Sequence, residues 1–151
     1  MLLGWFFINL FLFMIIHLKD LTKVVSEPES VWKITKELLM AEDEIDQDKE
    51  HFWVFHLDVR NQIKLIELVS LGSLDMNIVH PREVFTRAVG ERCASIIIAH
   101  NHPSGEVMPS EADLLITKRL VKAGEILGIE LIDHLVVTTT GFTSFKEKRL
   151  I

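Results

Sequence analysis

The chain has 151 residues, which is enough for one domain with a buried core. Apolar residues make up 48% of the chain and charged residues 25%, values that exclude an intrinsically disordered polypeptide. The formal net charge of −6 argues against non-specific binding of nucleic acid, because such binders carry a basic patch or stripe. We interpret the basic group Lys118, Arg119 and Lys122 as a solvated helix face rather than a nucleic-acid site.

The first 25 residues are treated as a separate segment. Residues 1–16 are apolar apart from Gly4 and Asn9, yet this run is shorter than the ~20 residues that a transmembrane helix needs. No Lys or Arg precedes the run and no small-x-small cleavage site follows it, so it does not fit a secretory signal peptide. Three alternatives stay open: a membrane anchor, an apolar helix docked on this domain or on a partner, or a start codon assigned too early, with Met14 as the later start.

The expected location follows from two features. Cys93 is the single cysteine, so no intrachain disulfide forms, which suits a reducing compartment. If residues 1–16 did cross a membrane, the basic flank at residues 17–23 would leave the main domain in the cytoplasm. We therefore expect a cytoplasmic protein, with membrane association through residues 1–16 as the alternative.

The first half of the remaining chain predicts a helix followed by two strands. Residues 26–30 are a linker or a helix-start signal, and residues 31–40 carry apolar side chains at helical spacing. Residues 41–49 are acidic and predict a solvated loop. Residues 52–57 and 63–71 predict paired strands joined by a polar turn. In the second strand, we expect one apolar face made by Ile63, Leu65, Val69 and Leu71.

The second half alternates helices and strands. Pro81 opens a helix, and its buried stripe is expected to contain Val84, Phe85, Ala88 and Val89. Residues 94–99 predict a central buried strand, and Cys93 before it is interpreted as a core residue. Residues 110–128 predict a long helix, capped by Gly128 and buried through Leu114, Leu115, Leu120, Val121, Ile126 and Leu127. With a strand at 131–138 and a closing element at 141–151, the order predicts an α/β sandwich around a mixed sheet.

The segment from His100 to Asp113 carries the residue types of a metal site. Because residues i and i+2 of an extended chain share a face, His100 and His102 at a strand end point the same way. The turn after His102 lets the chain reverse, and a helix that begins near Ser110 carries Asp113 in its first turn. Two His ligands, one Asp ligand and an open fourth position are the arrangement of a catalytic zinc site. Structural zinc sites are closed by four ligands and are rich in Cys.

Some of these residues also have a purely structural interpretation. Ser110 and Asp113 form the Ser-x-x-acid pattern of a helix-capping box, and capping is compatible with metal ligation. Asp133 and His134 interrupt an apolar strand, so they either orient the metal ligands or form hydrogen bonds within the sheet.

These motifs resemble a known family. His100, His102 and Asp113 match the JAMM (JAB1/MPN/Mov34) metalloprotease motif, His-x-His followed by Asp after ten intervening residues. More narrowly, residues 79–83, 100–105, 109–113 and 133–134 are similar to the RadC family of bacteria, in a short form that lacks the N-terminal helix-hairpin-helix region. The resemblance covers residues 31–151, and we assign residues 26–151 to this RadC-like JAMM/MPN domain.

The resemblance implies a fold and a set of functional residues. The fold is a three-layer α-β-α sandwich of the JAB/MPN, cytidine-deaminase-like type. One Zn²⁺ per chain is held by His100, His102, Asp113 and a water molecule. An upstream glutamate activates that water, and Glu50 stands where JAMM proteins place it; Glu67 and Glu83 are the alternatives. Ser110 is expected to help stabilise the oxyanion of the reaction.

Two functions follow from the resemblance. The first is a zinc-dependent metallopeptidase or isopeptidase, in which the zinc-bound water attacks an amide carbonyl of a peptide or isopeptide substrate. The second is a non-catalytic RadC-like module associated with DNA repair or mobile-element functions. The intact metal motif favours the first, and the missing helix-hairpin-helix region argues against direct DNA binding. Base deamination is disfavoured because the related deaminases use Cys ligands, which are absent near this motif.

Overall fold

The computed structural model describes residues 15–16, 24–25, 27–72 and 79–151. Within these ranges the chain forms one six-stranded sheet with the strand order β1-β3-β2-β4-β5-β6. The elements in chain order are β1 (Ile15–Ile16), α2 (Pro28–Met40), α3 (Glu44–Gln47), β2 (Glu50–Leu57), β3 (Ile63–Gly72), α4 (Pro81–Gly90), β4 (Ser95–Asn101), α5 (Glu111–Leu127), β5 (Glu130–Val137) and β6 (Phe142–Ser144).

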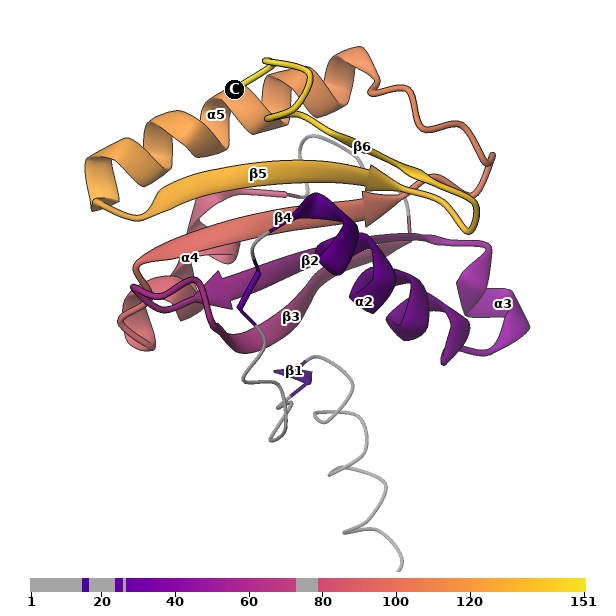
Figure 1. Ribbon diagram of the computed structural model, residues 1–151, viewed down its shortest axis with the longest axis horizontal. Helices are drawn as coiled ribbons and strands as arrows, with labels where there is room; N and C mark the ends of the chain where they lie inside the picture. The colour runs from indigo at the N-terminus through magenta and orange to yellow at the C-terminus, as the bar shows by residue number, and fades with distance from the viewer. Residues whose placement is uncertain (1–14, 17–23, 26, 73–78) are drawn as a thin grey trace, which may run out of the picture.

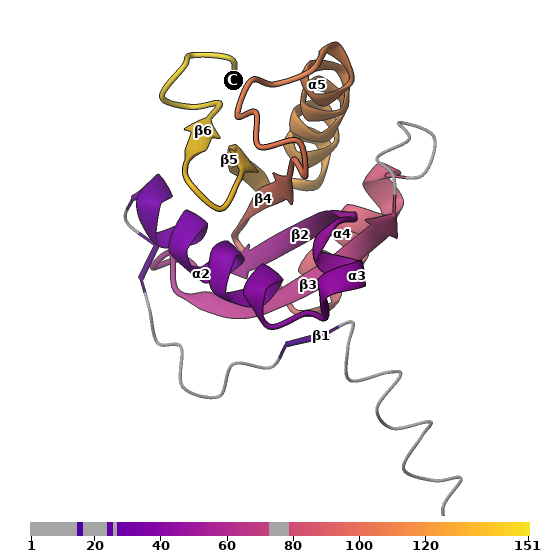
Figure 2. The same ribbon diagram turned by 90° about the vertical axis from the view of Figure 1, so that its right-hand side faces the viewer.

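The sheet lies between two helical layers (Figures 1 and 2). One buried cluster joins α2 to the sheet through side chains such as Val31, Phe55 and Leu135. A second cluster joins α4 and α5 to the opposite face, for example through Phe85 and Leu120. The sheet is mixed, because β4 and β5 are parallel while the other neighbours are antiparallel. The predicted α-β-α sandwich around a mixed sheet is therefore confirmed.

The central strand β4 determines the directions of the residues that follow it. Every residue of β4 is buried, and the strand is hydrogen-bonded to β2 on one side and to β5 on the other. Ile97 and Ala99 pack toward α2, whereas Ile96 and Ile98 pack toward α4 and α5. Because strand side chains alternate between faces, the His100 side chain lies on the side of α5 and the Asn101 side chain lies on the side of α2.

The predicted face of β3 was wrong because the strand contains two β-bulges. The pairing of β2 with β3 changes register twice, between Phe52 and Trp53 and between His56 and Leu57. Each extra residue in a bulge shifts the following side chains to the other face of the sheet. Ile63 and Ile66 therefore share the cluster under α2, while Leu71 is exposed.

The predicted buried stripe of α5 was only partly right: Leu120 is buried and Val121 packs against the core, but the other four leucine and isoleucine positions are exposed. The helix itself, its Ser110 N-cap and its Gly128 C-cap are confirmed. Leu114 is 40% exposed and Ile126 is 86% exposed. The buried face consists of Asp113, Ile116, Thr117, Leu120 and Gly124. This face carries the polar groups of the site described below, so apolar periodicity indicates its direction only in part.

Smaller differences concern the surface. The acidic stretch expected to be a loop contains the short helix α3, whose N-cap Asp43 accepts a hydrogen bond from the Asp46 N–H. Val89 is exposed rather than buried. Cys93 is buried in the cluster under α4, as expected, and burial raises the pKa of its thiol, which lowers its reactivity as a nucleophile.

The N-terminal apolar segment falls mostly outside the described residues. Its last two residues, Ile15 and Ile16, form β1 and pair with β3 at Glu67 and Ile66. Among the helices of the described ranges, none combines the length and apolar character needed to cross a bilayer. The anchor, docking and early-start alternatives for residues 1–25 stay predictions.

We predict that Gly124→Ala destabilises the fold by about 1–3 kcal/mol, because overpacking forces the backbone to move. A Cβ at position 124 would lie 2.4 Å from the backbone oxygen of Ile129 and 3.3 Å from the Phe85 ring. Urea unfolding measures the change. The matched control is Gly90→Ala in α4, where a Cβ meets no atom within 4 Å and no loss of stability is expected. Equal unfolding midpoints for the two variants would contradict the close approach of α5 to Ile129.

Candidate metal centre

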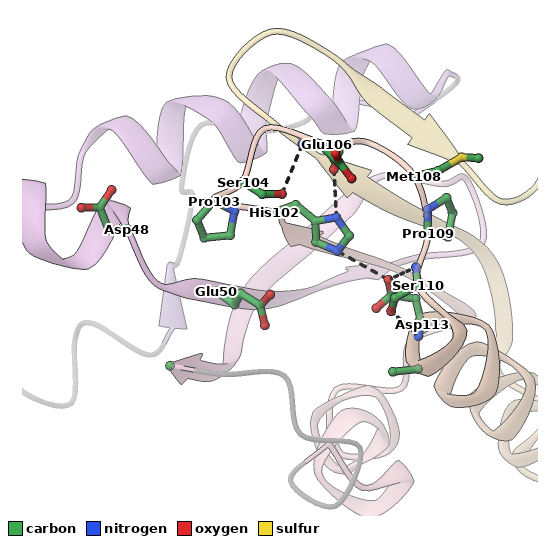
Figure 3. A pocket seen from close by; sticks show the side chains of 12 residues that line it. Asp48, Glu50, His102, Pro103, Ser104, Glu106, Met108, Pro109, Ser110 and Asp113 are labelled. Atoms are coloured by element: carbon green, nitrogen blue, oxygen red, sulfur yellow. Dashed lines mark hydrogen bonds and ion pairs between the residues drawn. The ribbon is translucent and has the colours of Figure 1, made fainter.

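A pocket of about 700 Å³ opens between the start of β2, the loop after β4 and the first turn of α5 (Figure 3). Glu50 enters it from β2, and Ser110 and Asp113 enter it from α5. His102 and Glu106 line it from the loop. The pocket thus collects residues from β2, from the loop after β4 and from the start of α5, which are far apart in sequence.

Three potential metal-binding groups converge beside this pocket. The Nε2 atoms of His100 and His102 lie 2.9 Å apart. Asp113 Oδ1 is 3.2 Å from His100 Nε2, and Asp113 Oδ2 is 3.4 Å from His102 Nε2. The three groups form a set within which all ligand atoms lie inside 4.8 Å of one another. The structure therefore brings together the three residues that the sequence predicted to be ligands.

Each histidine is held by a different part of the backbone. His100 belongs to β4, where it pairs with Phe52 of β2 and Val136 of β5, and its side chain is fully buried. His102 lies just beyond the strand, and its N–H continues the sheet by donating to the Val137 carbonyl at 3.0 Å. The chain then turns at Gly105, which has a φ of +84° that favours glycine.

Asp113 combines the capping and candidate-ligand roles that the sequence left open. The Ser110 N–H donates to Asp113 Oδ2 at 2.7 Å, and the Asp113 N–H donates to Ser110 Oγ at 3.1 Å. This reciprocal capping box fixes the carboxylate in the first turn of α5. The same carboxylate reaches both histidines, so capping aims it at the site.

The electrostatics of the site favour a bound cation. Burial opposes ionisation of Asp113, but hydrogen bonds with His100 and His102 outweigh it and hold the pKa of the carboxyl well below its usual range. The hydrogen bond with Asp113 raises the pKa of His102, against the opposing effect of burial. Since a group that attracts a proton in this way also attracts a metal ion, a proton and a metal would compete for the site.

The chemistry of the donor set fits a metal ion. The His102 Nδ1 lies 2.9 Å from the Glu106 carbonyl oxygen. A carbonyl can only accept, so His102 keeps a proton on Nδ1, and Nε2 either holds a second proton toward Asp113 or offers its lone pair to a metal ion. Two imidazole nitrogens at 2.9 Å beside a carboxylate need a proton or a metal ion between them. His, His and Asp are ligand types that suit zinc and several other divalent transition metals.

Glu50 is the first residue of β2 rather than the last residue of a loop, and its side chain points into the pocket (Figure 3). Its charge acts on His102, where it contributes to the raised pKa of that ring. The two alternative glutamates do not line the pocket. Glu67 contacts buried His56, with 3.1 Å between Oε2 and Nε2, and Glu83 is exposed beside Arg82.

Asn101, which lies between the two histidines, has a role that the sequence did not predict. Its side chain is buried on the α2 face of β4 and clamps the backbone on both sides of Glu50. The Asn101 Oδ1 accepts from the His51 N–H at 2.6 Å, and Nδ2 donates to the Lys49 carbonyl at 2.9 Å. The strand alternation of His100, Asn101 and His102 was the available signal: it places a buried amide on the face opposite the ligands.

Asp133 and His134, which the sequence treated as a pair, have separate roles because they lie on opposite faces of β5. Asp133 accepts from the Ser144 hydroxyl at 2.6 Å and from the Lys146 N–H at 3.0 Å, and it stabilises the turn after β6. His134 lies behind the set of candidate ligands His100, His102 and Asp113, called the metal group below. Its Nε2 is 2.8 Å from His100 Nδ1. Burial lowers the pKa of His134 well below its usual value.

The fold and the site together define an α-β-α sandwich protein with a His-His-Asp group able to hold a metal ion. The chain belongs to the RadC-like JAB domain family, whose model matches residues 25–150.

Curated relatives agree with this family assignment. A UPF0758 protein of Desulforamulus reducens is 47% identical over 113 residues, covering 75% of this chain and 50% of that protein. A UPF0758 protein of Syntrophomonas wolfei is 43% identical over 132 residues, covering 87% of this chain and 56% of that protein. A UPF0758 protein of Methanosarcina mazei is 42% identical, covering 84% and 53% respectively. The chain thus spans about half the length of these relatives.

We predict that the purified protein binds one divalent transition-metal ion per chain and that His100→Ala loses it, because the remaining groups no longer surround the ion. Elemental analysis after dialysis measures the metal content. The control is His80→Ala at the N-cap of α4, outside the metal group, which should keep full occupancy. Equal metal content in the wild type and His100→Ala would rule out this site.

We predict that Asn101→Ala lowers the free energy of unfolding by about 1–3 kcal/mol, because the His51 N–H loses its buried acceptor. Chemical denaturation measures the change. Gln47→Ala is the control: it removes an amide-to-carbonyl bond at the partly exposed α3 and should change stability by less than about 0.5 kcal/mol. An unchanged free energy of unfolding in Asn101→Ala would show that the clamp on the Glu50 backbone does not stabilise the fold.

Proposed function

We propose that this chain is a zinc-dependent hydrolase of the metallopeptidase or isopeptidase type. The observation that carries the proposal is the convergence of His100, His102 and Asp113 at an open pocket that Glu50 also lines. Three protein ligands beside an accessible pocket are the pattern of catalytic zinc sites, which keep one coordination position open. When bound there, zinc lowers the pKa of a water molecule toward ~7 and polarises a carbonyl.

Glu50 is the proposed general base and acid. Its carboxylate projects into the pocket that His102 and Asp113 also line. From there it takes a proton from the attacking water and later passes it to the leaving amine. The Asn101 clamp holds the Glu50 backbone, so the carboxylate starts from a defined position on β2.

Ser110 is proposed to stabilise the developing oxyanion. Its Oγ accepts the Asp113 N–H within the capping box and lines the pocket. That bond uses an acceptor lone pair, so the hydroxyl proton is not consumed by it. Donation of this proton to a substrate oxygen would add a stabilising hydrogen bond in the transition state.

We propose a peptide or isopeptide substrate and no direct binding of DNA. Carboxylates line the pocket, among them Asp48, Glu50 and Glu106. A pocket of this charge repels phosphate, and the chain as a whole carries a net charge of −6. The basic residues of α5 are exposed on the helix surface, as expected of a solvated face.

We predict that Glu50→Gln keeps zinc but lowers peptide hydrolysis by at least about 100-fold, because the amide cannot accept the proton from water. The assay follows new amine groups released from a mixed peptide library by the zinc-loaded full chain, and metal content is measured on the same samples. Glu83→Gln is the matched control and should hydrolyse at the wild-type rate.

Two results would redirect the proposal. Hydrolysis by Glu50→Gln at the wild-type rate would exclude Glu50 as the general base. Loss of hydrolysis in Glu83→Gln would assign that role to Glu83. A wild-type protein that binds zinc fully yet releases no amine from any peptide would favour the non-catalytic RadC-like module.

A further inference from the structure

A chain of buried polar groups runs behind the metal group and takes no part in the proposed reaction. Thr117 lies on the buried face of α5, one turn after Asp113, and His134 lies in β5. His134 Nδ1 is 2.6 Å from Thr117 Oγ1, and His134 Nε2 is 2.8 Å from His100 Nδ1. Thr117 and His134 are almost completely buried, so their polar groups have to be satisfied by other protein groups and not by bulk water.

The direction of each hydrogen bond follows from the first one. Thr117 Oγ1 donates its single proton to the Asp113 carbonyl oxygen at 2.6 Å, because a carbonyl can only accept. Toward His134 the hydroxyl must then act as acceptor, so His134 carries a proton on Nδ1. A neutral imidazole has only that one proton, which makes His134 Nε2 an acceptor. His100 therefore donates from its Nδ1.

We propose that Thr117 and His134 form a positioning relay that keeps His100 in its Nδ1–H tautomer and presents the His100 Nε2 lone pair to the metal. The relay consists of the Asp113 carbonyl, the Thr117 hydroxyl and the His134 ring. This inference rests on the proposed metal site. Outer partners of this kind fix the tautomer and orientation of a metal-binding histidine.

The packing keeps the relay rigid. The His134 ring stacks on Phe145, with 4.4 Å between ring centroids, and meets the edge of Phe52 at 6.2 Å. The relay also joins two of the candidate ligands, because it starts at the Asp113 backbone and ends at the His100 ring. A shift of the first turn of α5 would therefore reach both ligands together.

The first test determines the tautomers in the metal-free full chain. Long-range ¹H–¹⁵N correlation spectra of protein with labelled histidine distinguish an Nδ1–H ring from an Nε2–H ring. We expect His100 and His134 each to carry a proton on Nδ1. A His100 without a proton on Nδ1 in the wild type overturns the relay.

The second test removes the hydroxyl without changing the size of the side chain. Thr117→Val should convert His100 to a mixture of tautomers and weaken zinc binding by about 10- to 100-fold, measured by competition with a chromogenic chelator. Thr117→Ser restores the hydroxyl and should recover most of the affinity. The matched control is Thr35→Val in α2, which deletes another buried hydroxyl bonded to a carbonyl one turn earlier and should leave both readouts unchanged.

The outcomes separate this inference from the proposed function. If the wild type binds zinc and Thr117→Val binds it equally well, the relay is wrong while the hydrolase proposal stands. If the wild type shows the expected tautomers but binds no zinc, the proposed function fails and the relay remains as a property of the metal-free protein. Weaker zinc binding in Thr35→Val to the same degree as in Thr117→Val reduces the effect to general loss of packing and overturns the relay.

Discussion

The pairing of β4 with β2 on one side and with β5 on the other is the constraint on which the site depends. Buried between two strands and two helical layers, β4 cannot change register without moving its apolar side chains from one face to the other. Because side chains alternate along the strand, His100 at its end points toward α5 and Asn101 points toward α2. One strand end supplies a candidate metal ligand on one face and a clamp for the Glu50 backbone on the other.

The N-terminus of α5 supplies the second half of the site, and it shows how a local structural motif acquires a functional use. A capping box stabilises any helix start by satisfying backbone N–H groups. Here the acid of the box also lies within 3.2–3.4 Å of two imidazole nitrogens. The helix turn that follows carries Thr117, which links the same residue back to His134 and His100. Local stability and metal geometry are thus properties of the same few residues.

Polar groups in the core and β-bulges explain why the predicted buried faces of α5 and β3 differ from the observed ones. The buried face of α5 includes Asp113, Thr117 and Gly124, and these are the residues that a hydrophobic periodicity disregards. Apolar side chains such as Ile126 are exposed instead. In β3, two bulges change the face of successive residues, and a bulge depends on strand pairing rather than on composition. Both errors arise where tertiary contacts override local preference.

The sequence by itself determined the order of the longer helices and strands, the sandwich architecture and the candidate ligand trio, because alternation, capping residues and the His-x-His spacing act over short distances along the chain. Only the tertiary structure decided that Glu50, rather than Glu67 or Glu83, lines the pocket, since that depends on which strand lies beside β4. The separation of Asp133 from His134 and the roles of Asn101 and Thr117 also needed the folded chain. Their partners lie on other strands and helices, and no spacing in the sequence records which side chains meet across a sheet.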